Sequence, residues 1–492
     1  MILDGKILGT GKGELIMQKE AVRLKSIEIK NFKNVGYGKI DLVNNRKDYR
    51  ASILGLYGQN GSGKTALIDA LGLLKSCLSG WVIPSHYADF INVDAENSSF
   101  EYVFTVKTAD YDLEIFYSFC LAKKQVAQLN DGLLADNGLE KSAIIYNEIV
   151  SYSMEEIATG KKIRKSELIN TCDSNTVFTP AKRYKCFFGN SKNTVTDLLV
   201  LKKMAYKGST SFVFSREFLN HLNDVVRNNE TDERLQHSFV LNILSRFGLY
   251  ELFVIDSKTA GVIALNMLPI SFRLGENFDT VGGRVGLFLE KAVAIPEKFV
   301  TIAEKVIANM NVVLSQIIPG LTISVKKLGL ETLSNGETGC KVELMSNKNS
   351  KEIPLRNESE GIKKIVSILQ LLIVVYNQPS ITVAVDELDA GIFEYMLGEL
   401  LKIISDGGKG QLIFTSHNLR PLETLDRNFI AFTTTNTENR YVSCPSLKKS
   451  NNLRNVYYRQ IILGSDDYEL YETTNNSEIA FAFREAGVSC GM

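Results

Sequence analysis

One short segment restricts the fold of this chain more than any other. Residues 58–65, GQNGSGKT, carry glycine, glycine-lysine and threonine at the spacing of a phosphate-binding loop. A nearly continuous apolar run, residues 51–57, precedes the segment, and a helical apolar pattern, residues 65–78, follows it. A strand that is apolar along its whole length is buried on both faces, which is typical of a parallel sheet covered by helices.

The residue types of this loop predict its chemistry. Glycines let the backbone curl so that several N–H groups point at one phosphate, and the helix N-terminus adds a partial positive charge there. We expect Lys64 to reach the β- and γ-phosphates of ATP and Thr65 to ligate Mg²⁺. A chance glycine-rich turn is the alternative, and the flanking strand and helix argue against it. The expected nucleotide contacts are Gly58, Asn60, Gly61, Ser62, Gly63, Lys64 and Thr65.

Two strand ends in the last third of the chain supply further candidates. ITVAVDE ends in Asp386 and Glu387, and carboxylates at the carboxyl end of a parallel strand face the crevice where ligands bind. We expect Asp386 in the Mg²⁺ shell and Glu387 orienting the attacking water. The strand over residues 410–416 is followed by His417, whose imidazole can hydrogen-bond a γ-phosphate oxygen. Solvated acids and a structural histidine are the alternatives, but the order of these features after the loop favours catalysis.

Other elements follow from periodicity. Strands alternating with helices in the last third predict a mainly parallel sheet. Residues 22–32 and 98–122 alternate as antiparallel strands, whereas 123–190 look like short strands and polar loops, and 191–250 look helical. Further expected elements are strands at 38–43, 252–257, 261–274, 321–328, 339–345 and 428–433, and helices at 295–318, 360–376 and 391–406.

Composition excludes several classes of protein. The 492 residues carry 56 Lys+Arg and 56 Asp+Glu, so no basic excess points to nucleic acid, although a local basic groove stays possible. No apolar stretch reaches about 18 residues, so we expect no transmembrane helix and no membrane partner. The seven cysteines are scattered without a CxxC pair, which gives a disulfide framework or a zinc site little support and favours a reduced, cytoplasmic protein.

The order of these motifs resembles ATP-binding-cassette (ABC)-type ATPases. More narrowly it resembles the RecF/SMC-like branch, and within it the overcoming-lysogenisation-defect (OLD) and AAA-15/AAA-21-type ATPases of bacteria and phages. Residues 24–42 are similar to their first hairpin, 357–364 (NESEGIKK) to their signature motif, and 386–391 (DELDAG) to the Walker B and D-loop pattern. The resemblance covers residues 22–75 and 355–433 and says little about 125–340.

The resemblance implies further site residues. Ser359 and Gly361 would present a hydroxyl and backbone N–H groups to the γ-phosphate of ATP held by a second subunit, and Asp389 would sit at the dimer seam. A glutamate replaces the first glycine of the common LSGGQ signature, a form that the OLD-like branch tolerates. Ser359 is equally interpreted as a plain helix N-cap, and both roles can hold together. For the glutamine of a Q-loop, Gln125 and Gln128 are candidates that no pattern separates.

OLD nucleases carry a C-terminal Toprim domain, which is not expected here. About 75 residues follow His417, and their one acidic pair, Asp466-Asp467, lacks the preceding glutamate at a strand end. We therefore expect the ATPase component alone, working with a separate effector protein. Residues 453–464 (LRNVYYRQIILG) are similar to a tail motif of stand-alone AAA-15 proteins, and packing on the ATPase core is the alternative for this segment.

The expected fold is α/β, an ABC-type P-loop ATPase head with a mainly parallel core sheet, an N-terminal antiparallel β subdomain and an α+β insertion. The expected parts are 1–124 with the phosphate-binding loop, 125–340 as the insertion, 341–440 with the signature, Walker B and His417, and 441–492 as a tail that packs on the head or binds a partner.

The expected function is Mg²⁺-dependent ATP hydrolysis coupled to a homodimer or higher homo-oligomer, within a bacterial anti-phage (abortive infection) system. A RecF-like ATPase that clamps DNA in repair or replication is the main alternative. A scaffold that holds an effector and uses ATP as structural glue is the other, against which the intact Glu387 argues. The basic runs at 161–165 and 182–185 are solvated faces or contacts for DNA or a protein tail.

Overall fold

The computed structural model describes residues 20–42, 51–126, 140–228, 231–255, 267–274, 281–333, 336–443, 452–463, 469–472 and 474–489. Its strands are β1 (Ala21–Phe32), β2 (Val35–Asp41), β3 (Ser52–Tyr57), β4 (Asn97–Lys107), β5 (Tyr111–Val126), β6 (Glu140–Glu156), β7 (Lys162–Asn170), β8 (Leu252–Ile255), β9 (Met267–Leu274), β10 (Val281–Phe288), β11 (Val293–Pro296), β12 (Leu321–Thr332), β13 (Thr338–Lys348), β14 (Lys351–Pro354), β15 (Thr382–Val385), β16 (Gln411–Thr415), β17 (Ile430–Thr433) and β18 (Tyr441–Ser443). Its α-helices are α1 (Lys64–Leu78), α2 (Ala181–Phe188), α3 (Lys192–Lys207), α4 (Arg216–Asn228), α5 (Asp232–Arg246), α7 (Glu297–Ile317), α8 (Glu360–Asn377), α9 (Glu394–Gly407), α10 (Pro421–Thr424), α11 (Leu453–Leu463) and α12 (Asn476–Ser489).

The centre of the molecule is a six-stranded sheet in the order β18-β17-β3-β16-β15-β8. Every neighbouring pair is parallel except β17 and β18. Successive side chains of a strand point to opposite faces. In β3, Leu54 and Leu56 therefore belong to one hydrophobic core, while Ile53 and Tyr57 belong to the other. The predicted parallel sheet, apolar on both faces, is confirmed.

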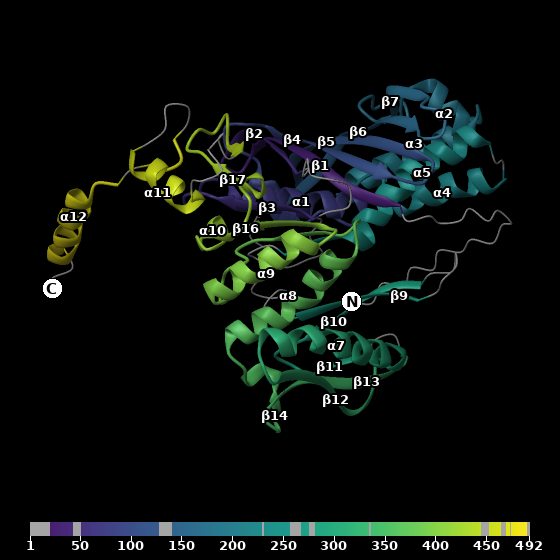
Figure 1. The fold of residues 1–492 in the computed structure, drawn as a ribbon. Helices are drawn as coiled ribbons and strands as arrows, with labels where there is room; N and C mark the ends of the chain where they lie inside the picture. Colours follow the sequence, from purple (N-terminus) through teal and green to yellow (C-terminus); the bar gives the residue numbers. More distant parts are fainter. Residues whose placement is uncertain are drawn as a thin grey trace, which may run out of the picture.

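An antiparallel sheet in the order β2-β1-β4-β5-β6-β7 covers one face of the core sheet, with α1 packed in the same hydrophobic core (Figure 1). Many of its inward-facing side chains are large and aromatic. The Phe32 and Phe100 rings, for example, meet edge to face with their centroids 5.1 Å apart. The Tyr102 hydroxyl donates to the carbonyl of Ala70, 2.8 Å away, and so ties β4 to α1. The antiparallel subdomain expected from alternation is confirmed.

The other face of the core sheet is covered by α8 and α9, and beyond them lie α7 and the sheet of β11, β13, β12 and β14 (Figure 1, green and teal). Helix α8 is apolar nearly all round because it lies between two layers, and its side chains from Ile365 to Val375 are mostly buried. The mixed α/β class with a mainly parallel core is therefore the observed fold.

Residues 123–190 depart from the prediction of short strands and loops. β6 and β7 are continuous strands of 17 and 9 residues that extend the antiparallel sheet, and α2 begins at Ala181. Their outward-facing positions carry many polar and charged side chains, which hides the strand pattern in the sequence. The strand β10 was not predicted either. The division of the chain into parts at residues 124, 340 and 440 stays a prediction.

One buried amide group joins the antiparallel sheet to the core sheet. The Oε1 atom of Gln411 accepts from the backbone N–H of Leu24 (2.8 Å) and from the Thr382 hydroxyl (3.0 Å). Its Nε2 atom donates to the Leu24 carbonyl (2.8 Å). Gln411 is only 1% exposed, so water cannot replace these bonds. The glutamine thereby takes the place of a strand partner for β1.

Replacing Gln411 with leucine should destabilise this joint strongly. The change keeps the volume but strands two backbone groups and a hydroxyl in an apolar setting, each costing about 1–3 kcal/mol. We expect the free energy of unfolding to fall by at least about 3 kcal/mol, the sum of the three smallest costs, measured by urea denaturation. Gln378→Leu, at an exposed position, is the control. Equal stability of the two variants would contradict the role of the amide.

Candidate functional site

The site is a cavity of about 480 Å³ at the carboxyl edge of the core sheet. Four segments that are distant in sequence form it: the turn between β1 and β2, the loop between β3 and α1, and the ends of β15 and β16. Its lining residues are Lys33, Asn34, Asn60, Gly61, Gly63, Lys64, Thr65, Ala66, Asp386, Glu387, Thr415 and His417. The structure therefore brings most of the loop, the acidic strand end and the histidine predicted from sequence to one place. The predicted contacts Gly58 and Ser62 are not among the lining residues.

The loop backbone has the conformation that its glycines allow. Gly61 and Gly63 have φ angles of 77° and 94°, in the left-handed region that favours glycine. A Cβ atom on Gly58 would lie 1.8 Å from the Thr433 hydroxyl oxygen, so a side chain there would clash with β17. The Tyr441 hydroxyl donates to the Gly63 carbonyl, 3.0 Å away. The carboxyl end of β17 and the first residue of β18 thus contact the loop from the side of the core sheet.

Lys64 is held inside the loop. Its Nζ atom donates to the carbonyls of Gly58 (2.8 Å) and Gln59 (2.9 Å), and the residue is only 6% exposed. Burial lowers the pKa of Lys64, while the carboxylates of Asp386 and Glu387 act in the opposite direction. Among the described residues, the hydrogen-bond acceptors of this buried ammonium are neutral carbonyls. It would gain from a phosphate, because hydrogen bonds between two charged groups are about twice as strong as neutral ones.

The end of β15 is organised by a hydroxyl from the neighbouring strand. Thr415 donates to Oδ1 of Asp386 (2.5 Å) and accepts from the backbone N–H of Glu387 (2.8 Å). Within the described chain, the buried Oδ2 of Asp386 has no hydrogen-bond partner. Asp386 and Thr65 both line the cavity, and a carboxylate oxygen with a hydroxyl is a set of hard oxygen donors that fits Mg²⁺.

Glu387 and His417 both reach the cavity from exposed positions. Glu387 has a φ angle of 49°, an uncommon backbone conformation for glutamate, which is compatible with a functional constraint. His417 is positioned by Asp389, whose Oδ2 accepts from the backbone N–H groups of His417 (3.1 Å) and Asn418 (3.0 Å). Asp389 does not line the cavity, and its place at a dimer seam stays a prediction.

Ser359 and Gly361 lie outside the residues that line this cavity. Ser359 is the N-cap of α8 and accepts from the Ile362 N–H at 3.4 Å, as the alternative interpretation expected. A Cβ atom on Gly361 would approach the Gly391 carbonyl to 2.6 Å, so glycine is needed for close packing on the D-loop. An action of either residue on a nucleotide held by another subunit stays a prediction.

Sequence reasoning missed four residues at or near the site. Two of them come from the turn of the first hairpin: Lys33, which pairs with Asp69, and Asn34, which donates to the Gly61 carbonyl. The third is Thr415, which orders the acidic strand end. The fourth is Lys364, which lies buried on α8. Burial lowers the pKa of Lys364, and Asp389, Glu387 and Asp386 oppose this. The sequence contains the pairs Lys33-Asn34 and Lys363-Lys364, but it does not indicate toward which part of the fold these side chains point.

The remaining sequence candidates are distributed elsewhere. Gln128, Asp466, Asp467 and the side chain of Gln125 lie outside the described residues. In the tail, the Tyr457 ring stacks on Phe432 with centroids 5.1 Å apart, so this part of α11 packs on the core sheet.

Both basic runs have partners in the protein itself. Lys162 pairs with Glu155 (2.9 Å), and Lys165 lies 3.5 Å from the centroid of the Phe116 ring. In the second run, Arg183 pairs with Glu233 (2.7 Å). No helix among the described residues is long and apolar enough to cross a membrane.

Thr415→Val should separate nucleotide binding from catalysis. Valine keeps the shape but removes the hydrogen bond to Asp386, and a bond to a charged group contributes roughly 1.5–3 kcal/mol. We expect ATP turnover to fall roughly 10- to 100-fold, with ATP affinity little changed. Thr382→Val, at the opposite end of β15, is the matched control. Equal turnover in the two variants would contradict the assignment.

Comparisons with known proteins give one family match and a group of similar solved structures. Residues 26–177 match the family model described as AAA domain, and no curated protein matches the sequence. Among solved structures, a SmcHead bound to the C-winged helix domain of ScpA is similar, with 12% identity over 86% of this chain and 98% of that chain and a TM-score of 0.36.

Two further solved structures have comparable identity, coverage and TM-score. The SMC head domain from Thermotoga maritima has 15% identity, coverage of 86% of this chain and 99% of that chain, and a TM-score of 0.32. The recombination mediator protein RecF-ATP in the RecFOR pathway has 14% identity, 81% and 94% coverage, and a TM-score of 0.33. Such values carry no information about single residues. The AAA-domain match and the geometry of the cavity support a P-loop ATPase.

Proposed function

We propose that this protein is a Mg²⁺-dependent ATPase whose nucleotide cavity is completed by a second copy of the chain. The observation that carries the proposal is the convergence of Lys64, Thr65, Asp386, Glu387 and His417 on one cavity. These side chains come from three separate segments and supply a phosphate ligand, metal ligands, a carboxylate for water and a hydrogen-bonding imidazole. A chance grouping of these types at a loop of this conformation would be hard to explain.

In the proposed mechanism, each residue acts on a different part of ATP. Lys64 exchanges its two carbonyl partners for phosphate oxygens. Thr65 and Asp386 would hold Mg²⁺, which would supply charge neutralisation. Glu387 accepts a hydrogen bond from the attacking water, and His417 hydrogen-bonds the γ-phosphate. Thr415 keeps Asp386 and Glu387 in place.

The position of Ser359 supports a composite site. Ser359 does not line the nucleotide cavity of its own subunit. It is nevertheless exposed at the N-terminus of α8. A helix N-terminus attracts anions because its N–H groups are unpaired. The γ-phosphate of ATP on a second subunit is a matching ligand, which is the arrangement that the sequence resemblance implies.

Glu387→Gln should bind ATP but hydrolyse it slowly. The amide keeps the shape of the side chain but cannot take the proton of water, and general base catalysis contributes roughly 10²- to 10⁴-fold. We expect turnover to fall by roughly that factor while ATP-dependent dimers accumulate, as measured by phosphate release and light scattering. Glu352→Gln, at an exposed position on β14, is the control. Unchanged turnover would remove Glu387 from the mechanism.

The composite site is tested by mixing two inactive variants. Lys64→Ala should abolish nucleotide binding, and Ser359→Arg should leave ATP binding by the single subunit intact but block dimerisation and turnover. A mixed dimer contains one intact pair, Lys64 from the Ser359→Arg chain and Ser359 from the Lys64→Ala chain. We expect partial recovery of ATPase activity on mixing. If both variants are folded and associate with wild type, no recovery would argue against a site shared between subunits.

For the biological role we propose an anti-phage ATPase of the OLD/AAA-15 kind that works with a separate effector. The support is the Ser-Glu-Gly signature and the tail motif at residues 453–464. The competing role is DNA clamping. Adding double-stranded DNA to the purified chain should leave ATP turnover unchanged, and Lys64→Ala should abolish protection in a phage-plating assay with neighbouring genes present. Strong stimulation by DNA, without protection, would favour the RecF-like role instead.

A further inference from the structure

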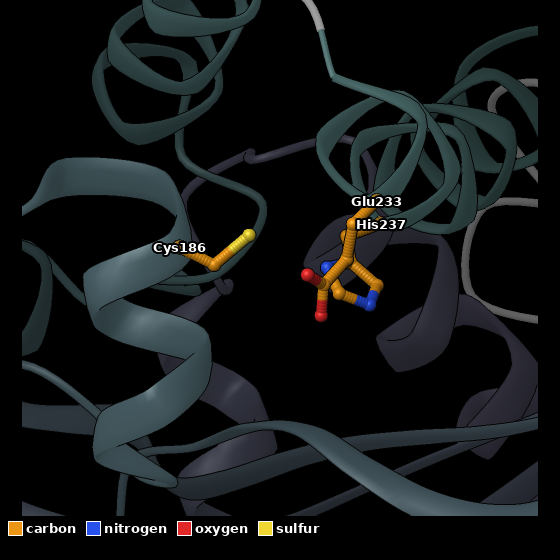
Figure 2. Close-up of side chains that lie close together, drawn as sticks. All are labelled: Cys186, Glu233 and His237. Atoms are coloured by element: carbon orange, nitrogen blue, oxygen red, sulfur yellow. The ribbon is translucent and has the colours of Figure 1, made fainter.

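A group of metal-ligating side chains lies in the helical region, away from the residues that line the nucleotide cavity. Cys186 is on α2, and Glu233 and His237 are on α5. One ligand atom from each side chain lies within 4.8 Å of the others. Figure 2 shows the thiol of Cys186 pointing toward the carboxylate and the imidazole, which lie side by side. The spacing of four residues places Glu233 and His237 on the same face of α5.

The histidine of this group has an unsatisfied nitrogen. His237 is 1% exposed, and its Nδ1 atom has no hydrogen-bond partner in the described part of the chain. Its other nitrogen, Nε2, lies 2.7 Å from NH1 of Arg183, which also donates to Glu233. Because a guanidinium can only donate, Nε2 accepts and the proton resides on Nδ1. A buried nitrogen without a partner is costly, and if its proton moves to Nε2, Nδ1 presents a lone pair that a cation can bind.

We propose that Cys186, Glu233 and His237 bind a zinc ion through Sγ, a carboxylate oxygen and Nδ1. Thiolate, imidazole and carboxylate are the ligands that Zn²⁺ takes in proteins, whereas Mg²⁺ and Ca²⁺ avoid sulfur. Three protein ligands leave a fourth tetrahedral position for water. Binding releases the thiol proton to solvent, and the imidazole proton moves from Nδ1 to Nε2, so the imidazole stays neutral.

Arg183 competes with the metal for Glu233 and His237. Once Nε2 carries the proton, it can no longer accept from Arg183, so metal binding breaks that bond. The guanidinium side chain is 19% exposed and can turn toward solvent. The ion would then link α2 to α5, which the Arg234 side chain already joins by donating from Nε to the Cys186 carbonyl (2.6 Å). The site would therefore fix the packing of two helices.

The first test measures zinc binding to the reduced full-length chain by competition with a chromophoric chelator. We expect one zinc per chain, and a Cys186→Ser variant with affinity lower by roughly tenfold or more. Cys172→Ser removes an exposed thiol outside the group and is the matched control. Cobalt(II) should give a thiolate charge-transfer band in wild type and in the control, but not in Cys186→Ser.

The second test uses the competitor. Arg183→Gln, shown to be folded by circular dichroism, should bind zinc several-fold more tightly than wild type, because the guanidinium no longer occupies His237 and Glu233. Zinc should also raise the melting temperature of wild type but not of Cys186→Ser. Absence of stoichiometric zinc in both wild type and Arg183→Gln would overturn the proposal, as would full zinc affinity in Cys186→Ser. In that case the group serves only to hold Arg183.

Discussion

Parallel pairing of β3, β16 and β15 is the constraint on which the rest of the structure depends. Parallel strands end at the same edge of a sheet, so the phosphate-binding loop, His417 and the Asp386-Glu387 pair meet there although they are far apart in sequence. The pairing requires a crossover helix for each strand and hence cover on both faces. Helix α1 on one face, and α8 and α9 on the other, meet this requirement with apolar side chains.

The same edge of the sheet holds charged groups whose hydrogen bonds to the described part of the protein do not compensate their charge. Lys64 is buried against neutral carbonyls, and one oxygen of Asp386 has no hydrogen-bond partner in the described chain. Buried charges destabilise a fold unless they are paired. ATP with Mg²⁺ would pair a cation and an anion at once, so nucleotide binding is expected to stabilise the folded state through linkage.

The helices α2 to α5 share a hydrophobic core with the antiparallel sheet and α1. Phe187, Phe214 and Phe218 belong to the same hydrophobic core as α1 and the antiparallel sheet. The buried carboxylate of Glu148 on β6 accepts from Tyr117 (2.8 Å) and from the backbone N–H of Phe212 (2.8 Å) and so holds the helices to the sheet. A zinc ion linking α2 and α5 would therefore stiffen a layer that is continuous with the helix after the phosphate-binding loop.

The sequence by itself determined the parts of this protein that local patterns encode. The glycine spacing of residues 58–65, the apolar strand before them and the acids ending ITVAVDE predict a loop and a strand end, because the conformation and periodicity of a short segment depend on its own residues. The tertiary structure alone decided which distant side chains meet. It placed Lys33 and Asn34 beside the loop, set the Thr415 hydroxyl on Asp386, and gathered Cys186 with His237 in the absence of any CxxC signal. These contacts depend on strand register and helix packing across the chain, which one-dimensional spacing does not specify.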